Sequence, residues 1–373
     1  MIYNAIQFIG YELDTLPDHG SGTYRGNMDA RKDLAKRCAI LKGAIEMAAS
    51  RPTIKRSSGI LKVFMAPEFF FRSSDGAYPI DVLSEIMGTM KQETQKEKYT
   101  HWLFVYGTAV GAIDHGRETE ILNCALVQKG GQAPEGFRGV REYVVYKEYM
   151  SPNDFIRETK DPTGNDWYLP LGRGRNVTLG GQKKRPVIPT EGSREMMSRK
   201  INRPGAKTQS SSINPTGKIS EVNRSGIGGG SIFTIDHVTF GLETCLDHAR
   251  ERLAEYIPLE GENLIQVQLI PSAGIPICHG QKRPAGGNYP DSLAGVMHSL
   301  AFNVDGKRVH SEALIRTGGA PRPIASVEKI PVTLPFFTQM SVSPELYFKS
   351  LGKIAIYKEA PLPPRQIWED DDD

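Results

Sequence analysis

Short apolar runs alternate with helix-like segments at the start of the chain and then follow one another directly. Apolar residues at positions 34, 38, 41 and 45 fall three or four apart, the spacing of a helix with one buried face. Residues 61–66 form a short apolar run bounded by Gly59 and Pro67, as expected of a strand. After the predicted strand at residues 102–106, those at 121–127 and 143–147 follow without a long helix between them. This mixture favours an α/β (α+β) fold of packed sheets with helices outside over a purely parallel doubly wound sheet.

The predicted elements cover most of the chain outside one long segment. Helices are predicted at residues 29–49, 82–96 and 249–256. Strands are predicted at residues 5–9, 61–66, 102–106, 121–127, 143–147, 231–235, 238–244 and 263–270, with weaker signals at 299–304, 312–316 and 354–357. Residues 111–117 have the composition of a turn-rich connection, and Asp236-His237 is predicted to be the turn of a hairpin.

The gross composition indicates one large domain over residues 1–373. Of the 373 residues, 39% are hydrophobic, enough for a substantial core. The net charge of +3 does not favour a nucleic acid or membrane partner, and no run of about 18 apolar residues predicts a membrane span. The N-terminus lacks the basic region of a secretory signal. The four cysteines lie far apart, which disfavours a metal site or a disulfide framework, so we expect a cytoplasmic, reduced protein.

A basic insertion rich in Gly, Ser and Pro interrupts the pattern at about residues 160–228. Residues 160–224 contain 13 Lys and Arg but 5 Asp and Glu. A structureless loop this long inside a domain indicates a lid over a site or a mobile insertion. Its basic runs also suit phosphate contacts, but without interleaved aromatic residues the nucleic-acid interpretation is weak. The acidic C-terminal tail, residues 369–373, is typical of a solvated terminus, with contact to the insertion of a neighbouring subunit as the alternative.

Three predicted strands end in residues that can do chemistry. One ends in the carboxylate of Glu68, another in the ammonium of Lys147, and a third in the thiol of Cys245. Each has an ordinary structural explanation by itself: a carboxylate paired to a surface base, a solvent-facing lysine, and a small buried thiol. Polar residues at strand ends commonly converge on one site in α/β folds, so their occurrence together favours a site.

In order and local sequence, these segments resemble the signatures of the nitrilase superfamily of carbon–nitrogen hydrolases. That family has a glutamate after a strand and a proline, a lysine at the end of a later strand, and a cysteine in a Gly-x-x-x-Cys-x-Asp turn. The matching segments here are Ala66-Pro67-Glu68, Tyr146-Lys147 and Gly241-Leu242-Glu243-Thr244-Cys245-Leu246-Asp247. The stretches at 106–108, 123–125 and 268–273 agree as well. The resemblance covers roughly residues 1–160 and 228–275, and it implies a four-layer α-β-β-α sandwich that assembles as dimers or larger homo-oligomers.

The chain also departs from the family pattern. The segment between Lys147 and Cys245 is longer than is usual in the family, and the basic insertion accounts for the excess. The arginine usually found four residues after the cysteine is Ala249 here, with Arg250 beside it, and the histidine two residues after the lysine is Tyr149. These differences leave the core chemistry in place and put the substrate pocket in doubt.

The resemblance implies a mechanism that needs no cofactor or metal. The thiolate of Cys245 attacks the substrate carbon, Lys147 and the backbone N–H of Leu246 hold the negative charge, and Glu68 moves the protons. A second glutamate often supports the lysine in this family. Glu158 is our choice for it, with Glu148 and Glu243 as alternatives.

The residues around the three chemical groups are candidates for substrate binding. We predict this role for Leu246, Asp247, His248 and Phe70. A Cys–His pair of the protease type is the weaker interpretation of His248, because a histidine on the first turn of a helix more often caps or packs, and the thiol-protease signature is absent. His279 is a further candidate for the rim of the pocket.

The predicted function is hydrolysis of a non-peptide C–N bond in a small amide or carbamoyl substrate. Asp247, two residues after the cysteine, is closer to the amidases of the family than to its true nitrilases, which more often have a glutamate there. A nitrilase or an amide-forming acyltransferase is the alternative within the family. Outside it, the alternative is a non-catalytic homologue that binds an acidic partner through the basic insertion.

Overall fold

The fold is described from a computed structural model of the chain. The structure describes residues 3–17, 24–114, 119–136, 140–147, 231–249, 253, 265–277, 298–317, 320–333 and 343–364, and the short strands at 156–160, 166–170, 187–189 and 227–228. The acidic tail, Tyr149, Arg250, His279 and most of the basic insertion lie outside the described residues.

The larger of two sheets is mixed, with parallel strands at its centre. Its order is β17 (Ser326–Pro331), β18 (Lys353–Tyr357), β1 (Ala5–Glu12), β2 (Ile60–Met65), β4 (Trp102–Asp114), β5 (Thr119–Lys129), β9 (Val187–Pro189), β8 (Asp166–Pro170) and β7 (Ile156–Lys160). Off this path, β6 (Glu142–Tyr146) pairs with β5 and with β10 (Ile227–Gly228), β19 (Ala360–Pro361) with β1, and β3 (Tyr78–Pro79) with β4. Strands β1, β2 and β4 are parallel neighbours, so their C-terminal ends point toward the same edge of the sheet.

The smaller sheet follows the insertion in the sequence. Its order is β11 (Ile232–Ile235), β12 (Val238–Leu242), β13 (Val267–Ser272), β14 (His298–Asp305), β15 (His310–Thr317) and β16 (Arg322–Pro323). Strand β13 is buried along its whole length and pairs in parallel with β12 and β14. The hairpin turn predicted at Asp236-His237 is confirmed, with φ of 48° and 66° at the two residues, as a tight two-residue turn requires.

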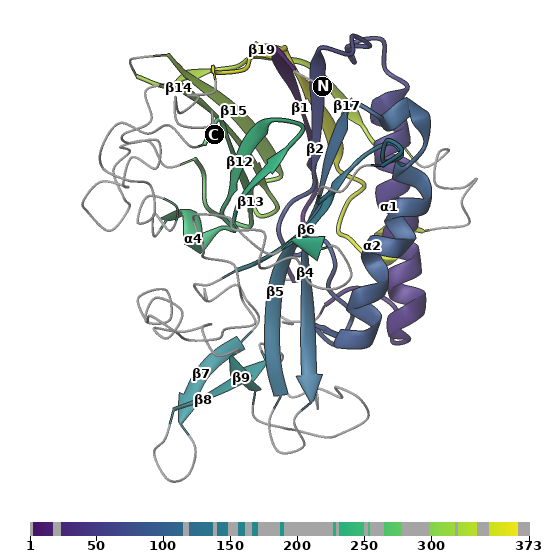
Figure 1. Ribbon diagram of the computed structural model, residues 1–373. Coiled ribbons are helices and arrows are strands. Elements are labelled where there is room, and N and C mark those ends of the chain that lie inside the picture. Colours follow the sequence, from purple (N-terminus) through teal and green to yellow (C-terminus); the bar gives the residue numbers. More distant parts are fainter. Residues whose placement is uncertain are drawn as a thin grey trace.

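The described elements form three layers (Figure 1). Helices α1 (Ala30–Ala49) and α2 (Ile80–Thr94) cover one face of the larger sheet, and the smaller sheet packs against its other face. The core between the sheets includes the stacked rings of Phe8 on β1 and Phe302 on β14, with centroids 4.6 Å apart. The mixed α and β architecture is therefore confirmed. The four-layer arrangement of the predicted sandwich stays a prediction.

Both long helices lie within two residues of their predicted bounds. Asp29 caps α1 by accepting the Lys32 N–H at 3.1 Å, and Asp33 in the first turn suits the positive end of the helix dipole. Of the third predicted helix, at 249–256, the structure describes only Ala249 and Leu253, so it stays a prediction. Helix α4 spans Leu246–Ala249, and most of residues 250–256 lie outside the described part of the chain.

Two predictions about connections are wrong. Residues 111–117 were predicted to be turn-rich, but β4 continues to Asp114 and pairs antiparallel with β5 as two long arms (Figure 1). The basic insertion was predicted to lack regular structure, but it contains β8 and β9, which join the end of β5 through Thr119–Ile121. Part of the insertion therefore extends the larger sheet beyond β5.

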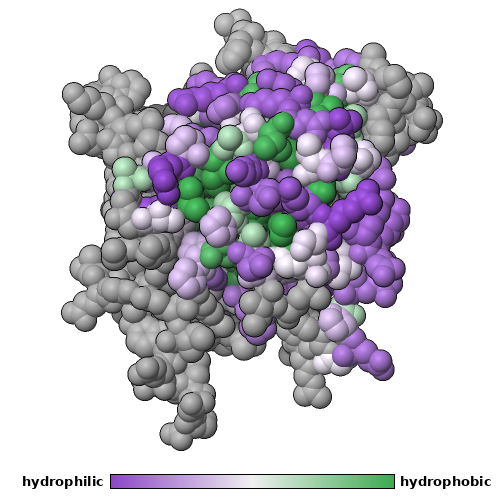
Figure 2. All heavy atoms as spheres, turned by 90° about the horizontal axis from the view of Figure 1, so that it is seen from above, coloured by the Kyte–Doolittle hydropathy of each residue, from purple (hydrophilic) through white to green (hydrophobic). Residues whose placement is uncertain are grey.

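None of the described helices is long and apolar enough to cross a membrane. Figure 2 views the end of the molecule at which β19 lies in Figure 1, and its surface alternates hydrophilic residues with small hydrophobic groups. The segments that follow β1 and β2 leave the sheet at the other end of these strands, and β4 continues beyond them (Figure 1).

Candidate active site

The loop after β2 brings Glu68 against the smaller sheet. The Glu68 N–H donates to the carbonyl of Ser272, the last residue of β13, at 3.3 Å. Thr15 Oγ1 donates to the Glu68 carbonyl at 2.6 Å, and the Phe69 N–H donates to Thr108 Oγ1 at 2.8 Å. The peptide groups on both sides of Glu68 are thus held by residues from outside the loop, and the side chain is fully buried.

The loop depends on a close approach to Gly107 of β4. Gly107 has φ of +76°, and a Cβ at this position would lie 2.2 Å from the Pro67 carbonyl oxygen. Phe69, directly after Glu68, has φ of 64°, a left-handed conformation that costs free energy in a bulky residue. Such strain persists only where the surroundings hold it in place, and it is common near functional sites.

Lys147 follows β6 and forms an ion pair with Glu68. Its backbone N–H donates to the carbonyl of Asn123 on β5 at 2.7 Å, and its Nζ donates to Glu68 Oε1 at 2.9 Å. Asn123 Nδ2 donates to the same carboxylate oxygen at 3.0 Å. The side chains of Lys147 and Glu68 are 2% and 0% exposed. Each charge therefore offsets the desolvation of the other in a site with little water.

Cys245 lies at a sharp turn between β12 and α4. Its φ of 50° is left-handed, and its N–H donates to the carbonyl of Pro271 on β13 at 3.1 Å. The N–H groups of His248 and Ala249 donate back to the Cys245 carbonyl at 3.1 and 3.3 Å, which starts the helix directly at the thiol. A strained turn from strand to helix is a recurrent way to present a nucleophile.

The end of β13 joins the two halves of the site. Cys245 is bound to the carbonyl of Pro271, and Glu68 is bound to the carbonyl of Ser272, the next residue along the strand. Consecutive Cα atoms lie about 3.8 Å apart. The strand end therefore places the thiol turn of the smaller sheet next to the Glu68 loop of the larger sheet, with Lys147 paired to Glu68.

Glu243 braces the cysteine turn from within the smaller sheet. Its carboxylate is buried, with Oε2 lying 2.7 Å from His248 Nδ1 and accepting from Gln268 Nε2 at 2.6 Å. Its Oε1 accepts from the Leu253 N–H at 2.7 Å. This acid links the strand before Cys245 with the residues after it. The sequence contained one hint of this, because Glu243 and Cys245 alternate onto the same strand face.

Glu158, the predicted second glutamate, lies elsewhere in the larger sheet. It is in β7, where its Cα pairs with Tyr168 of β8, and its side chain lies outside what the structure describes. Its catalytic role stays a prediction. Asn123 was missed as a site residue, although the pattern of residues 123–125 was noted. Its contact with Glu68 joins residues 55 apart in the chain, and no local pattern indicates such a contact.

The four predicted substrate-binding residues differ in their surroundings. Leu246 is partly exposed, whereas Asp247 and His248 are fully buried. Phe70 is buried in the core beneath the helices, where its ring lies 5.0 Å from each of the rings of Phe71 and Phe348. The binding roles of all four stay predictions. Within the described part of the chain, no three His, Cys, Asp or Glu side chains are grouped as metal ligands.

Known proteins offer distant similarities only. No protein-family model and no curated protein sequence matches the chain. In structure, the chain is similar to an amidase from Nesterenkonia sp., with 10% identity, a TM-score of 0.37, and coverage of 87% of this chain and 92% of that one. It is also similar to a carbon-nitrogen hydrolase from Helicobacter pylori G27, with 10% identity, a TM-score of 0.36, and coverage of 96% and 89%.

A larger protein matches over part of its length. This is a glutamine-dependent NAD(+) synthetase from Cytophaga hutchinsonii, with 12% identity and a TM-score of 0.32. The match covers 85% of this chain and 40% of the synthetase.

Proposed function

We propose that this chain is a thiol hydrolase of the nitrilase superfamily type, which cleaves a non-peptide C–N bond in a small amide or carbamoyl compound. The observation that carries the proposal is the buried Lys147–Glu68 pair, 2.9 Å apart, beside the strained turn that presents Cys245. A nucleophile, a proton carrier and a fixed cation are the three groups that acyl transfer from an amide requires.

Acylation uses all three groups. Glu68 takes the proton from the Cys245 thiol, and the sulfur attacks the carbonyl carbon to form a tetrahedral oxyanion. Lys147 and the Leu246 N–H stabilise that oxygen, because both are in place before the charge develops. The C–N bond then breaks as Glu68 returns the proton to the leaving nitrogen, which departs as ammonia or an amine.

Deacylation repeats the two proton transfers, with water in place of the thiol and the thiolate in place of the leaving nitrogen. Glu68, again a carboxylate, takes a proton from water, and the resulting hydroxide attacks the thioester carbon. The C–S bond breaks, the thiolate recovers a proton from Glu68, and the carboxylic acid leaves. One carboxylate therefore acts as base and then acid in each of the two half-reactions. The buried contact with Lys147 suits this role, because the ammonium keeps Glu68 fixed within reach of the reacting atoms.

The test is to trap the acyl-enzyme. The protein is incubated with a panel of amides, ureides and nitriles, quenched in acid, and measured by intact mass. An adduct equal to the acyl group is expected on the wild type and absent from Cys245→Ala. Cys38→Ala is the matched control, because Cys38 is a buried thiol of α1 that is not one of the proposed catalytic groups, and this variant should keep the adduct.

Product analysis separates the alternatives. Ammonia plus acid from an amide supports hydrolysis of amides. Turnover of nitriles but not amides would make the chain a nitrilase, and transfer of the acyl group to an added amine in preference to water would make it an acyltransferase. No adduct and no turnover across the panel would favour a non-catalytic binding protein. A cytoplasmic location and a homo-oligomeric assembly belong to the same proposal.

A further inference from the structure

Glu243 and His248 form a buried bridge across the turn that carries the proposed nucleophile. Glu243 Oε2 lies 2.7 Å from His248 Nδ1, and the two side chains are 1% and 0% exposed. The four residues that the bridge encloses include Cys245 and Leu246, which supply the thiol and the oxyanion-binding N–H in the proposed mechanism. A single pair of side chains therefore closes a ring around both groups.

The carboxylate of Glu243 is itself fixed from two further segments. Its Oε2 accepts from Gln268 Nε2 on β13 at 2.6 Å, and its Oε1 accepts from the Leu253 N–H at 2.7 Å. The backbone N–H of Glu243 donates to the carbonyl of Leu269 at 3.1 Å. Both carboxylate oxygens act as acceptors, which suits the ionised form, so His248 is the donor through Nδ1. The buried acid thus holds the imidazole in one orientation, with a proton on Nδ1.

Strand β12 makes room for the segment that returns to Glu243. A Cβ at Gly241 would lie 2.6 Å from Leu253 Cδ1 and 2.7 Å from Ile265 Cδ1. Leu253 also packs with Ile232 and Ile265 in a small buried cluster. A glycine at this position lets Leu253 lie on the strand, with its N–H at the carboxylate. The restraint on the turn therefore begins in β12, before the cysteine, and is closed by residues after it.

The turn needs such a restraint because Cys245 has a left-handed backbone. Its φ of 50° costs free energy in a residue with a side chain, and such a conformation persists only where the surroundings hold it. The N–H groups of Asp247 and His248 donate to the carbonyls of Thr244 and Cys245, at 3.0 and 3.1 Å. These bonds lie within a single short turn, which is not stable by itself. The side-chain bridge supplies the tertiary restraint.

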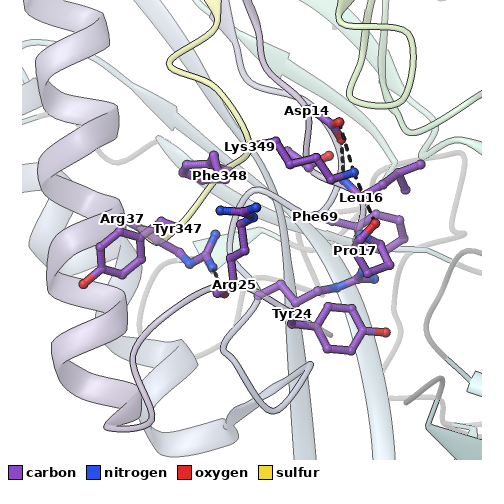
Figure 3. A pocket seen from close by; sticks show the side chains of 12 residues that line it. Asp14, Leu16, Pro17, Tyr24, Arg25, Arg37, Phe69, Tyr347, Phe348 and Lys349 are labelled. Atoms are coloured by element: carbon purple, nitrogen blue, oxygen red, sulfur yellow. Dashed lines mark hydrogen bonds and ion pairs between the residues drawn. The ribbon is translucent and has the colours of Figure 1, made fainter. Parts of the chain in front are cut away.

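The Glu68 half of the site is restrained separately. Phe69, the residue after Glu68, lies among side chains of the segments after β1 and before β18 (Figure 3). Lys349 ties those two segments together through an ion pair and a hydrogen bond, both of 3.2 Å. Substitutions in the bridge can therefore disturb the thiol turn while the Glu68 loop keeps these contacts.

We infer that Glu243 and His248 are positioning residues for the proposed hydrolysis, which hold the thiol and the Leu246 N–H in the geometry that attack on the substrate requires. The inference rests on the proposed function, because it concerns the same thiol. His248 moves no proton to or from the substrate, and what the turn requires of it is a hydrogen-bond donor at the place of Nδ1. A displacement of about 1 Å can lower a rate by about a hundredfold. Loss of the bridge should therefore lower kcat far more than it raises KM.

The test separates this donor from the imidazole by replacing His248 in two ways. Asn Nδ2, like His Nδ1, is bonded to Cγ, so His248→Asn keeps an N–H near that position, whereas His248→Ala has no donor. In His248→Ala, kcat should fall by about tenfold or more with KM within about twofold, and His248→Asn should recover most of the loss. The substrate is the amide of the panel that the wild type turns over fastest. Circular dichroism checks that each variant is folded at the assay temperature.

Amide hydrogen exchange gives a second readout that needs no turnover. Peptides that cover residues 243–249 and residues 5–12 are followed by mass spectrometry after dilution into heavy water. The first peptide should exchange faster in His248→Ala than in the wild type, because the turn opens locally. His248→Asn should restore slow exchange there. The peptide of β1 should exchange alike in all three proteins, which excludes a general loss of stability as the cause.

Gln266→Leu is the matched control for loss of a buried polar network in the same sheet. Gln266 accepts from the Thr239 N–H at 3.0 Å and donates to the Pro363 carbonyl at 2.6 Å, at the end of β12 opposite the thiol. This variant should lose stability and keep the wild-type kcat. Gln268→Leu, two residues along the same strand, removes a donor to Glu243 and should lower kcat.

The outcomes have distinct meanings. Recovery of kcat in His248→Asn supports the inference. An equal loss in His248→Asn and His248→Ala overturns it, because the imidazole would then take part in the chemistry, and wild-type activity in His248→Ala overturns it as well. If His248→Ala does not fold, the two glutamine variants decide, and an equal kcat in them overturns the inference.

Failure of the proposed function is recognised separately. If the wild type turns over no compound of the panel, the proposed function fails, and the exchange rates alone decide on the bridge. Unchanged exchange of residues 243–249 in His248→Ala would then show that the bridge does not hold the turn. Normal turnover in the wild type together with unchanged exchange and kcat in the variants overturns the inference and leaves the proposed function intact.

Discussion

At the scale of single residues, Glu68 and Lys147 place opposite charges where almost none of their side-chain surface is exposed. Such a pair adds little net stability, because two desolvation costs oppose one attraction. Removing one member has a larger effect, since the other charge is then buried without its partner. The pair therefore makes activity and stability respond differently to the same substitutions.

Lys147→Met should abolish acyl-enzyme formation and lower the free energy of unfolding by about 3 kcal/mol, because it leaves the Glu68 carboxylate buried without the ammonium. The double variant Glu68→Gln with Lys147→Met should regain most of that stability and none of the activity. Urea unfolding at pH 7 measures the stability of the single and the double variant, and the acyl adduct measures their activity. The control is Lys96→Met, which breaks an exposed pair with Glu93 and should cost less than about 1 kcal/mol. An equal cost in the two single variants would contradict the prediction.

Cys245 is a second residue with this kind of effect, because its left-handed backbone conformation lowers the stability of the fold. Cys245→Gly should be more stable than Cys245→Ala by about 1 kcal/mol, since glycine adopts this conformation without a Cβ clash. Both variants should lack the acyl adduct. Thermal unfolding of the two proteins side by side measures the difference. A less stable glycine variant would show that the turn is not strained.

At the scale of elements, Gly107 determines how closely the Glu68 loop lies on β4. Gly107→Ala should lower the free energy of unfolding by more than about 2 kcal/mol and reduce acyl-enzyme formation, because the new Cβ would meet the Pro67 carbonyl at 2.2 Å. Gly136→Ala is a matched control. Gly136 has nearly the same φ, +75°, but a Cβ there meets nothing within 4 Å. The Gly136→Ala variant should therefore lose only the stability that a left-handed backbone costs an alanine, and it should keep the activity.

Glycines also explain where prediction of the elements failed. Gly111 made residues 111–117 look like a turn, yet it lies inside β4, where a Cβ would come within 2.6 Å of Leu83 on α2. The glycine permits a close approach of helix and sheet. Composition alone cannot distinguish that role from a turn. The long helices were predictable, because their buried faces repeat with the helical period.

The site shows the same division. The positions of Glu68, Lys147 and Cys245 after strands were predictable because each carries a local motif, and their catalytic roles stay a proposal. The bonds from Asn123 to Glu68 and from Glu243 to His248 depend on strand register and on the exact path of a turn. Those are properties of the folded chain, set by packing between segments that are far apart or turn back on each other.

At the scale of the whole molecule, Glu12 is a buried link between the two sheets. It lies on β1 of the larger sheet and accepts bonds from the backbone N–H and Oγ of Ser311 on β15 of the smaller sheet, at 3.0 and 2.8 Å. Lys329 Nζ donates to the same oxygen at 2.9 Å. Burial acts to raise the pKa of Glu12, but the bonds and charge of Lys329 and the bonds of Ser311 outweigh it, so the pKa lies below its usual 4.5.

The sign of the pH effect follows from that lowered pKa. Glu12 contributes stability above pH 4.5, and the contribution is lost as the pH falls through the lower pKa of the folded protein. Glu12→Gln should therefore be less stable than the wild type at pH 7, and the difference should shrink below pH 4.5. Urea unfolding at several pH values between 3 and 7 measures it. A difference that stays constant over this range would rule out the carboxylate as the cause.

The adjacent carbonyls of Pro271 and Ser272 limit how the sequence of this protein can change in evolution. The carbonyls that accept the N–H groups of Cys245 and Glu68 belong to consecutive residues, so one peptide unit of β13 sets the spacing between the two halves of the site. Gain or loss of a single residue in that strand would turn the two carbonyls toward each other's partners and reverse the side chains that follow. Descendants of this gene can therefore exchange side chains along β13, but they cannot change its length and keep the chemistry.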